Sequence, residues 1–290
     1  MKFLVSDRLD PAFHLALEEV LFFEGDFDSL LFFYRNTPSV ILGKHQNPWM
    51  EANLSVAEAE SVPVLRRISG GGCVVHDEDN INYSLIQKDV PSKTVDFPSL
   101  YRPVLEGLRQ MGIDVQTSER NDFRVKGKKI SGSAQYMRRD TTLFHGTLLV
   151  DSDLARIHRL LDRDEGIVYE THAANSVPSP VLNLSEEYEI GSTSEFLARW
   201  VDQIQEICQL EPLQLKAKWI DKAEKLVEEK YRSWEWNRGM TPVFTAKWDS
   251  VEIKVKNGRF LTVSDSLDQS WVGKEVPEDL LRWFKEQNIS

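Results

Sequence analysis

One lysine stands among small polar residues in the stretch 129–135, which reads KISGSAQ. Side chains alternate between the two faces of a strand, so the pattern predicts that Lys129, Ser131 and Ser133 share one polar face. Small side chains around a single ammonium group leave room for an anionic ligand. An ordinary solvated strand face has the same pattern. The stretch therefore offers a candidate cation for a ligand groove and leaves the solvated alternative open.

A second candidate site is the stretch 66–72, which reads RRISGGG. Apolar, β-type residues precede and follow it, so we predict a strand, a glycine turn and a second strand. Glycine has no Cβ, so its backbone N–H groups can approach a phosphate closely while Arg67 adds a bidentate contact. The spacing is neither that of a Walker loop nor that of a dinucleotide fingerprint. A tight hairpin with two solvated arginines is the alternative.

Two histidines and a cysteine near these stretches also carry reactive groups. His76 and His145 could act as acid or base, although a hydrogen-bonded structural histidine is commoner in a strand pattern. Cys73 follows the glycines in an apolar run, where a small buried thiol is commoner than a nucleophile. The histidines, cysteines and carboxylates of the sequence show no metal-ligand spacing. We therefore predict no metal site built by the protein.

The composition limits the classes of partner. A chain of 290 residues allows one large domain and a small second one, and 41% hydrophobic with 28% charged residues is an ordinary globular mixture. The net charge of −11 argues against general binding of nucleic acid or of an anionic membrane. Cys73 and Cys208 match no disulfide pattern, and the sequence shows no signal peptide or membrane-spanning run. We expect a cytoplasmic protein whose partners are small molecules or proteins.

Helices and strands alternate along the chain and would position both stretches. Asp10-Pro11 predicts a helix start, Ser192 with Glu195 predicts a capping box, and Asn257-Gly258 predicts a hairpin. From Pro242 onwards, short alternating strands indicate a second, smaller α+β unit. The further predictions are helices over 52–60, 99–111, 153–161 and 215–231, strands over 30–34, 39–42 and 81–86, hairpins over 121–150, and a last helix from Pro277.

Taken together, three blocks resemble the signature of the lipoate-protein ligases: RRISGGG at 66–72, KISGSAQ at 129–135 and HGTLL at 145–149. Their order and spacing agree, and the similarity extends to RND at 120–122 and SWEWN at 233–237. The resemblance implies the α+β fold of the biotin and lipoate ligases, a mixed β-sheet flanked by helices. It also implies a catalytic domain over 1–240 and a small α+β C-terminal accessory domain over 241–290.

The same resemblance implies a two-step reaction. Lipoate and ATP give lipoyl-adenylate, and the lipoyl group then passes to a lysine of a lipoyl domain, in an E2 subunit or in the glycine-cleavage H protein. Lys129 matches the catalytic lysine that contacts the lipoate carboxyl and the adenylate phosphate, and magnesium is expected on the triphosphate. The residues implied to bind ATP or lipoate are Arg67, Ser69, Gly70, Gly71, Gly72, Cys73, Val74, Val75, Asn80, Asp122, Ser131, Ser133, His145 and Thr147.

One loop departs from the family pattern. Members often have SVRSRVxNL, whereas this chain has SVPSPVLNL at 176–184, with Pro178 and Pro180 in place of both arginines. Phosphate or partner contacts from that loop are therefore not carried over.

Two other functions compete with the ligase. The first is an octanoyl or lipoyl transferase of the same superfamily, which moves the acyl group between carrier proteins through a cysteine thioester. The stretch between Cys73 and Cys208 contains no cysteine near the lysine motif. The second is a non-catalytic binder of nucleotide or of lipoylated protein, which the intact lysine and glycine stretch argue against. Release of pyrophosphate from ATP in the presence of lipoate distinguishes the ligase from both.

Overall fold

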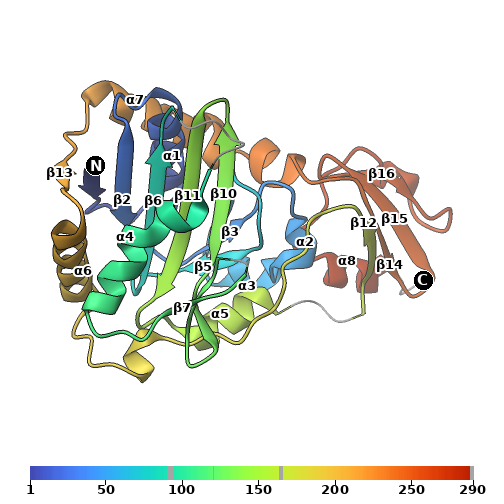
Figure 1. The fold of residues 1–290 in the computed structure, drawn as a ribbon. Coiled ribbons are helices and arrows are strands. Elements are labelled where there is room, and N and C mark those ends of the chain that lie inside the picture. The colour runs from blue at the N-terminus through green and yellow to red at the C-terminus, as the bar shows by residue number, and fades with distance from the viewer. Residues whose placement is uncertain (90–94, 120, 163–165, 288–290) are drawn as a thin grey trace. The chain divides into compact units, whose positions relative to one another are not determined.

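The computed structural model describes residues 1–89, 95–119, 121–162 and 166–287, so Arg120 of the RND block lies outside the described residues. The chain packs into two compact units (Figure 1). Unit 1 comprises Met1–Pro38, His76–Asp153 and Pro178–Val227, and unit 2 comprises Ser39–Val75, Leu154–Val177 and Glu228–Ser290. Both units combine helices and strands, which confirms the predicted α+β class with mixed sheets flanked by helices.

Unit 1 is built on a six-stranded mixed sheet in the order β10-β11-β6-β2-β1-β13. Strand β1 is parallel to β2 and to β13, whereas β2, β6, β11 and β10 are antiparallel neighbours. The strands are β1 (Lys2–Val5), β2 (Ser29–Tyr34), β6 (Asn80–Gln87), β10 (Ser133–Arg138), β11 (Thr141–Leu149) and β13 (Glu211–Pro212).

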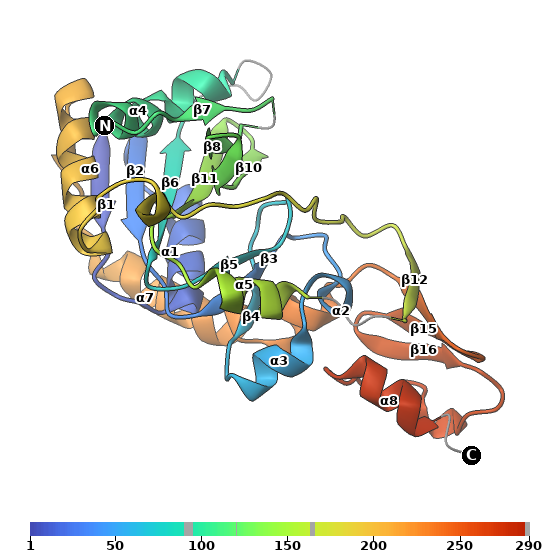
Figure 2. The ribbon, with the colours of Figure 1, turned by 90° about the horizontal axis from the view of Figure 1, so that it is seen from below.

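Helices cover both faces of this sheet (Figure 1, Figure 2). Leu31 and Phe33 of β2 join a core with α4 and α6, whereas Phe32 and Tyr34 contact the ring of His14 in α1. Alternate residues of one strand are therefore buried under different helices, which explains why the strand is apolar throughout. The helices are α1 (Pro11–Glu24), α4 (Phe97–Gln110), α6 (Thr193–Ile207) and α7 (Ala217–Leu226), and a 3₁₀ turn spans Leu184–Glu186.

Two predicted helix starts, those capped by Asp10 and Ser192, are confirmed. The carboxylate of Asp10 accepts hydrogen bonds from the amides of Ala12 and Phe13, which have no partner within the first turn of a helix. The hydroxyl of Ser192 accepts from the amide of Glu195, and the Glu195 side chain accepts from the amide of Ser192. Capping side chains therefore begin both helices where the sequence predicted them.

A small sheet in unit 1 carries the lysine stretch. It consists of β7 (Gln116–Thr117), β8 (Phe123–Val125) and β9 (Lys128–Ser131). The prediction of one alternating strand through 129–135 is wrong, because β9 pairs with β8 whereas β10 pairs with β11, and Gly132 separates them. Ser131 is buried, while the half-buried Ser133 donates to the carbonyl of Asn121. The strand alternation does not continue across Gly132, so the predicted polar face does not exist.

Unit 2 contains two sheets around one apolar core. The orders are β4-β3-β5 and β12-β14-β15-β16, and the core joins Trp49, Val64 and Leu160 to Phe244 and Trp283. The strands are β3 (Ser39–Leu42), β4 (Val64–Arg66), β5 (Val74–His76), β12 (Val168–Thr171), β14 (Phe244–Trp248), β15 (Val251–Lys256) and β16 (Arg259–Val263). The helices are α2 (Pro48–Glu51), α3 (Leu54–Ala59), α5 (Leu154–Leu161) and α8 (Leu280–Gln287), with π turns at Val227–Tyr231 and Glu235–Gly239 and a 3₁₀ turn at Gln269–Trp271.

The C-terminal part of unit 2 follows its sequence signals closely. Asn257 and Gly258 have φ of 52° and 68° and join β15 to β16, which confirms the predicted hairpin. Strand β12 pairs with β14, so the four-stranded sheet includes a strand from well before residue 241. The division into a catalytic domain 1–240 and a small accessory domain 241–290 stays a prediction. None of the described helices is long and apolar enough to cross a membrane.

Candidate active site

Strand β9 presents Lys129 beside a buried carboxylate. The Lys129 ammonium lies 2.9 Å from Oδ1 of Asp122, and the two side chains are 25% and 10% exposed. The backbone of Lys129 donates to the carbonyl of Pro180 at 2.8 Å and accepts from the amide of Leu182 at 3.0 Å. The segment around Val181 therefore runs parallel to β9 at the lysine and fixes its backbone. The lysine is a partly accessible cation on a rigid support.

Two glycines leave space around the lysine and its neighbours. A Cβ at Gly132 would lie 3.2 Å from both Cε and Nζ of Lys129, and a Cβ at Gly146 would lie 2.5 Å from the hydroxyl of Tyr83. The amide of Gly132 donates to the hydroxyl of Thr147 at 3.3 Å. Any side chain at 132 would press on the ammonium group, which explains the glycine in the KISGSAQ block.

A second cation, which sequence analysis missed, shares the carboxylate. Arg124 of β8 pairs directly across from Lys129 of β9, and its guanidinium lies 3.8 Å from Oδ2 of Asp122. The same guanidinium donates to the carbonyl of Gly127 at 2.9 Å and to the hydroxyl of Ser179 at 3.2 Å. Like charges directly opposite each other repel, so the carboxylate between them stabilises the pair. The available signal was the two-residue spacing of Asp122 and Arg124, which places them on one side of a strand.

His145 is held by a buried acid that sequence analysis also missed. Its Nδ1 donates to the Glu18 carboxylate at 2.9 and 3.1 Å, and their side chains are 9% and 1% exposed. The hydroxyl of Ser84, paired across the strands from His145, donates to the same carboxylate. Glu18 lies on the buried, largely apolar face of α1, one turn after the buried His14, and this position was the signal available in the sequence. The contact fixes the orientation of the imidazole ring and a proton on Nδ1.

Three further predicted residues of unit 1 are buried or half-buried in the sheet. Ser131 forms a hydrogen bond with the hydroxyl of Tyr83 at 3.1 Å, and burial raises the pKa of Tyr83 above its usual value. The side-chain amide of Asn80 donates to the side-chain oxygen of Asn82 at 2.9 Å. The side-chain oxygen of Asn80, Oδ1, is buried and meets no donor within the described residues. Ser133 is the third of these residues and donates to the carbonyl of Asn121 at 3.1 Å. With Asp122, His145 and Thr147, described above, they complete the predicted set of unit 1.

The glycine stretch of unit 2 is wrapped around the side chain of Arg67. This guanidinium donates to Ser69 Oγ at 2.9 Å, to the carbonyl of Ile41 at 3.1 Å, and to the carbonyls of Gly70 and Gly72 at 2.6 and 2.8 Å. The hairpin alternative is wrong, because β3 lies between β4 and β5. The solvated alternative is also wrong, because Arg67 is only 5% exposed. A bidentate contact from Arg67 to phosphate stays a prediction, whereas its contacts with the loop carbonyls are observed.

Close approaches hold the middle of this loop. A Cβ at Gly43 would lie 2.1 Å from the carbonyl oxygen of Gly71, whose φ of +87° favours glycine. The hydroxyl of Ser176 accepts from the amide of Cys73 at 2.9 Å and from the side chain of Gln46 at 3.0 Å. These contacts fix the shape of the loop.

Arg66 connects the start of this loop to the SWEWN block. It is fully buried, and burial first and nearby Arg238 second lower its pKa to about 10. The indole of Trp236 donates to the Arg66 carbonyl at 2.6 Å. The guanidinium donates to the carbonyls of Gly43, Lys44, Gln46, Trp236 and Asn237 and to the hydroxyl of Thr241.

The two cysteines, both within the described residues, form no disulfide and lie in different surroundings. Cys73 is half-buried directly before β5, which also contains the predicted Val74 and Val75. Cys208 ends α6, where its thiol donates to the carbonyl of Ile204 at 3.5 Å and burial raises its pKa. A raised pKa leaves less thiolate, so Cys208 is a poor nucleophile.

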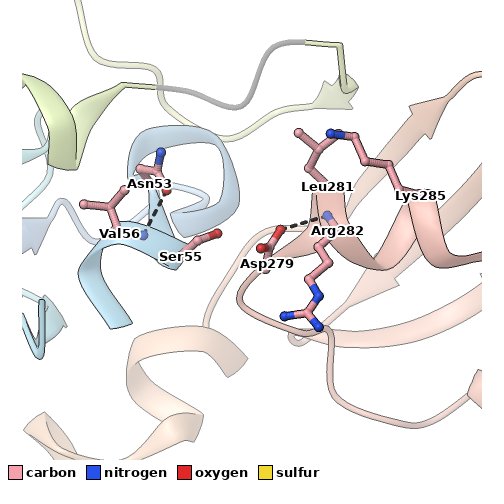
Figure 3. A pocket seen from close by; sticks show the side chains of 7 residues that line it. All are labelled: Asn53, Ser55, Val56, Asp279, Leu281, Arg282 and Lys285. Carbon is pink, nitrogen blue, oxygen red and sulfur yellow. Dashed lines mark hydrogen bonds between the residues drawn. The ribbon is translucent and has the colours of Figure 1, made fainter. Parts of the chain in front are cut away.

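Unit 2 also contains a pocket that includes none of the predicted site residues (Figure 3). The carboxamide of Asn53 and the carboxylate of Asp279, both drawn in Figure 3, accept hydrogen bonds from backbone amides at the starts of their helices. The cavity measures about 360 Å³ and is lined by Asn53, Ser55, Val56, Asp279, Leu281, Arg282 and Lys285. Helix capping accounts for two of its polar side chains, Asn53 and Asp279.

The structure thus groups the predicted residues into two sets. One set lies in unit 1 together with Lys129, and the other forms the glycine loop of unit 2. Across the described ranges, histidines, cysteines and carboxylates form no group of three that could hold a metal ion. The lysine set offers cations for an anionic ligand, and the loop set offers glycine backbone for a phosphate.

Comparison with known proteins assigns this arrangement to a class. Residues 10–205 match the model of the lipoyl protein ligase A/B catalytic domain, and the chain belongs to that family. It is 35% identical over 240 residues to lipoate-protein ligase LplJ of Bacillus subtilis, covering 81% of this chain and 72% of the relative. It is 33% identical over 273 residues to lipoate-protein ligase 1 of Staphylococcus aureus, and the match covers 89% of this chain and 82% of the relative. Within the family, the chain is a lipoate-protein ligase, an enzyme.

Solved structures agree with this assignment. A Thermoplasma acidophilum protein with bound lipoic acid has a TM-score of 0.68 at 25% identity, over 81% of this chain and 98% of that one. A lipoate-protein ligase A bound with ATP has a TM-score of 0.69 at 25% identity, over 82% and 98%. The bipartite lipoate protein ligase of Thermoplasma acidophilum, described with its E2 lipoyl domain, has a TM-score of 0.68 at 25% identity, over 82% and 96%.

Proposed function

We propose that this ligase joins lipoate to ATP as lipoyl-adenylate and then transfers the lipoyl group to a lysine of a lipoyl domain. The observation that carries the proposal is Lys129, a partly exposed ammonium 2.9 Å from a carboxylate on a fixed strand. The binding of lipoic acid and of ATP by similar proteins supports lipoate and ATP as the ligands.

In the first step, a carboxylate oxygen of lipoate attacks the α-phosphorus of ATP, and pyrophosphate leaves with the electron pair of the broken P–O bond. The step brings two anionic groups together, so an ammonium group between them stabilises the developing charge. In the second step, the amine of the acceptor lysine attacks the lipoyl carbonyl, AMP leaves, and the amine loses a proton. Lys129 is proposed to contact the carboxyl and phosphate oxygens in both steps.

The glycine loop is proposed to bind the nucleotide. Backbone amides of the loop would approach phosphate oxygens directly, since three consecutive residues lack a Cβ. Arg67 would contribute by shaping the loop, because its donors already hold the loop carbonyls. The residues proposed to contact ATP or lipoate fall in two groups. Those of the glycine stretch are Ser69, Gly70, Gly71, Gly72, Cys73, Val74 and Val75. Those of unit 1, besides Lys129, are Asn80, Asp122, Ser131, Ser133, His145 and Thr147.

Magnesium is proposed to arrive with the nucleotide. Mg²⁺ keeps several waters and commonly binds through one or two carboxylates and substrate phosphates. The described residues offer no cluster of three ligands, which fits an ion held mainly by the triphosphate. Bound there, magnesium would neutralise charge on the phosphates.

The proposed acceptors are E2 lipoyl domains and the glycine-cleavage H protein, and the solved ligase described with its E2 lipoyl domain supports the first. The test uses the purified chain with ATP, magnesium and lipoate. We expect lipoate-dependent release of pyrophosphate without acceptor, and addition of one lipoyl group to an acceptor lysine when a lipoyl domain is present. Acyl transfer between carrier proteins without ATP would instead identify the transferase.

A further inference from the structure

The ammonium of Lys129 forms an ion pair with Asp122, and its proposed contact with lipoate and the adenylate phosphate would weaken that ion pair. In this structure its ammonium lies 2.9 Å from Asp122, whose side chain is 10% exposed. Contact with a lipoate carboxyl and an adenylate phosphate would draw the ammonium away from that carboxylate. A carboxylate left buried without a counter-ion is costly, so the exchange opposes ligand binding unless another cation replaces the lysine.

Arg124 is placed to be that cation. Its guanidinium is 3.8 Å from the second oxygen of Asp122, and its side chain is 30% exposed. A guanidinium presents five donors, of which those to Gly127 and Ser179 use only two, so further donors are available for the Asp122 carboxylate. A small shift of Arg124 would convert the 3.8 Å approach into a direct hydrogen bond with Asp122.

We propose that Arg124 is a positioning residue that takes over the Asp122 carboxylate when Lys129 turns to its ligands. The inference rests on the proposed function, because it assigns Arg124 a part in the binding step of that reaction. The alternative is a purely structural role for Arg124. In that role its side chain would only link the turn at Gly127 to the segment that contains Ser179.

The two roles predict different kinetics. The exchange takes place as the carboxylate substrate binds, so replacement of Arg124 should change ground-state and transition-state binding equally. We expect Arg124→Gln to raise the KM for lipoate about tenfold and to change kcat less than about threefold, within the range of neighbouring charge pairs. Arg124→Lys keeps the charge and should recover at least a third of the lost kcat/KM. Lys126→Gln, which removes an exposed cation from the same hairpin, should match the wild type.

A double-mutant cycle identifies the partner. If Arg124 acts through Asp122, the Arg124→Gln change should cost less than about twofold in an Asp122→Asn background, where no buried charge needs a counter-ion. An equal cost in both backgrounds, or a parallel loss of kcat, would overturn the inference. Circular dichroism and melting temperature check the folding of every variant. If Arg124→Gln does not fold, the cycle is run with Arg124→Met, which also removes the charge, under the same criteria.

The wild type is assayed first for lipoate-dependent pyrophosphate release. Absence of that release contradicts the proposed function. An active wild type with an additive cycle contradicts only the role given to Arg124.

Discussion

Gly43 and Gly71 approach each other so closely that a Cβ on Gly43 would lie 2.1 Å from the carbonyl oxygen of Gly71. Gly70 directly precedes Gly71 in the same loop. Apart from its two chain neighbours, no atom of the described chain lies within 4 Å of the ideal Cβ position of Gly70. One glycine is therefore required by the protein itself. The other is free of that requirement and available to a ligand.

This contrast gives a matched pair of variants. Gly43→Ala should lower the melting temperature, because two backbone segments must separate to admit the methyl group, at a cost of about 1–3 kcal/mol. Gly70→Ala should leave the melting temperature within about one degree, because the methyl group meets no atom of the described chain within 4 Å, and it should raise the KM for ATP if the loop binds the phosphates as proposed. Thermal denaturation and pyrophosphate-release kinetics measure the two effects. An unchanged KM in Gly70→Ala would remove this loop from the nucleotide site.

Lys129 supplies the second prediction. Lys129→Ala should lower adenylate formation, and transfer from pre-made lipoyl-adenylate, by on the order of a hundredfold or more, as expected when a positioned charge is removed. Lys129→Arg should not restore either step, because a planar guanidinium differs from an ammonium group in size and geometry. Both half-reactions are measured separately with folded protein. Near-normal turnover in the alanine variant would contradict the catalytic assignment.

The sequence predicted local features well where one residue determines them. Asp10 caps α1 and Asn257-Gly258 turns the last hairpin, because capping and positive φ are properties of neighbouring residues. Prediction from the sequence failed where pairing with a strand that is distant in the sequence determines the local structure. Strand pairing with β8 and β11 interrupts the lysine stretch at Gly132, and nothing within that stretch records which strands will pair with it.

The arginines of the glycine stretch show the same limit for the site. Two adjacent charges in a glycine-rich stretch indicate exposure, and yet Arg66 and Arg67 are buried, because backbone carbonyls from remote segments accept their hydrogen bonds. Glu18 was missed for the same reason, since its partner His145 lies 127 residues away in the sequence. The resemblance supplied Lys129, whereas the structure was needed to find what surrounds it.

His14 supplies a prediction about pH. Burial is the main cause that lowers its pKa from 6.5 to about 4, and its Nδ1 donates to Asn36 at 2.6 Å while Nε2 contacts Ser6 at 2.8 Å. The unfolded chain binds a proton between pH 6.5 and 4 that the folded chain does not, so this contribution to stability is complete above pH 6.5 and falls with pH through that window. The loss should reach about 3 kcal/mol near pH 4.

The measurement compares wild type with His14→Gln, whose amide can keep a hydrogen bond but does not titrate. The difference in unfolding free energy between the two proteins, from urea denaturation at several pH values, should change by that amount between pH 7 and pH 4. A pH-independent difference would show that the folded His14 has an ordinary pKa.

The last prediction separates the ligase from the transferase through the thiols. A thioester mechanism needs a nucleophilic cysteine, and Cys208 is unsuited because burial raises its pKa and its thiol donates to the carbonyl of Ile204. The double change Cys73→Ser, Cys208→Ser should keep ATP-dependent lipoylation of an acceptor domain. Serine retains a hydroxyl donor at 208, and the stability cost should be about 1 kcal/mol, since both thiols are half-buried.

Omission of ATP completes this test. The wild type, given free lipoate and an acceptor domain without ATP, should form no lipoylated product, because the carboxylate is then not activated. The same protein given an octanoylated or lipoylated carrier in place of lipoate and ATP should also transfer nothing. A folded but inactive double mutant, together with carrier-to-carrier transfer by the wild type, would establish the thioester route and replace the ligase mechanism.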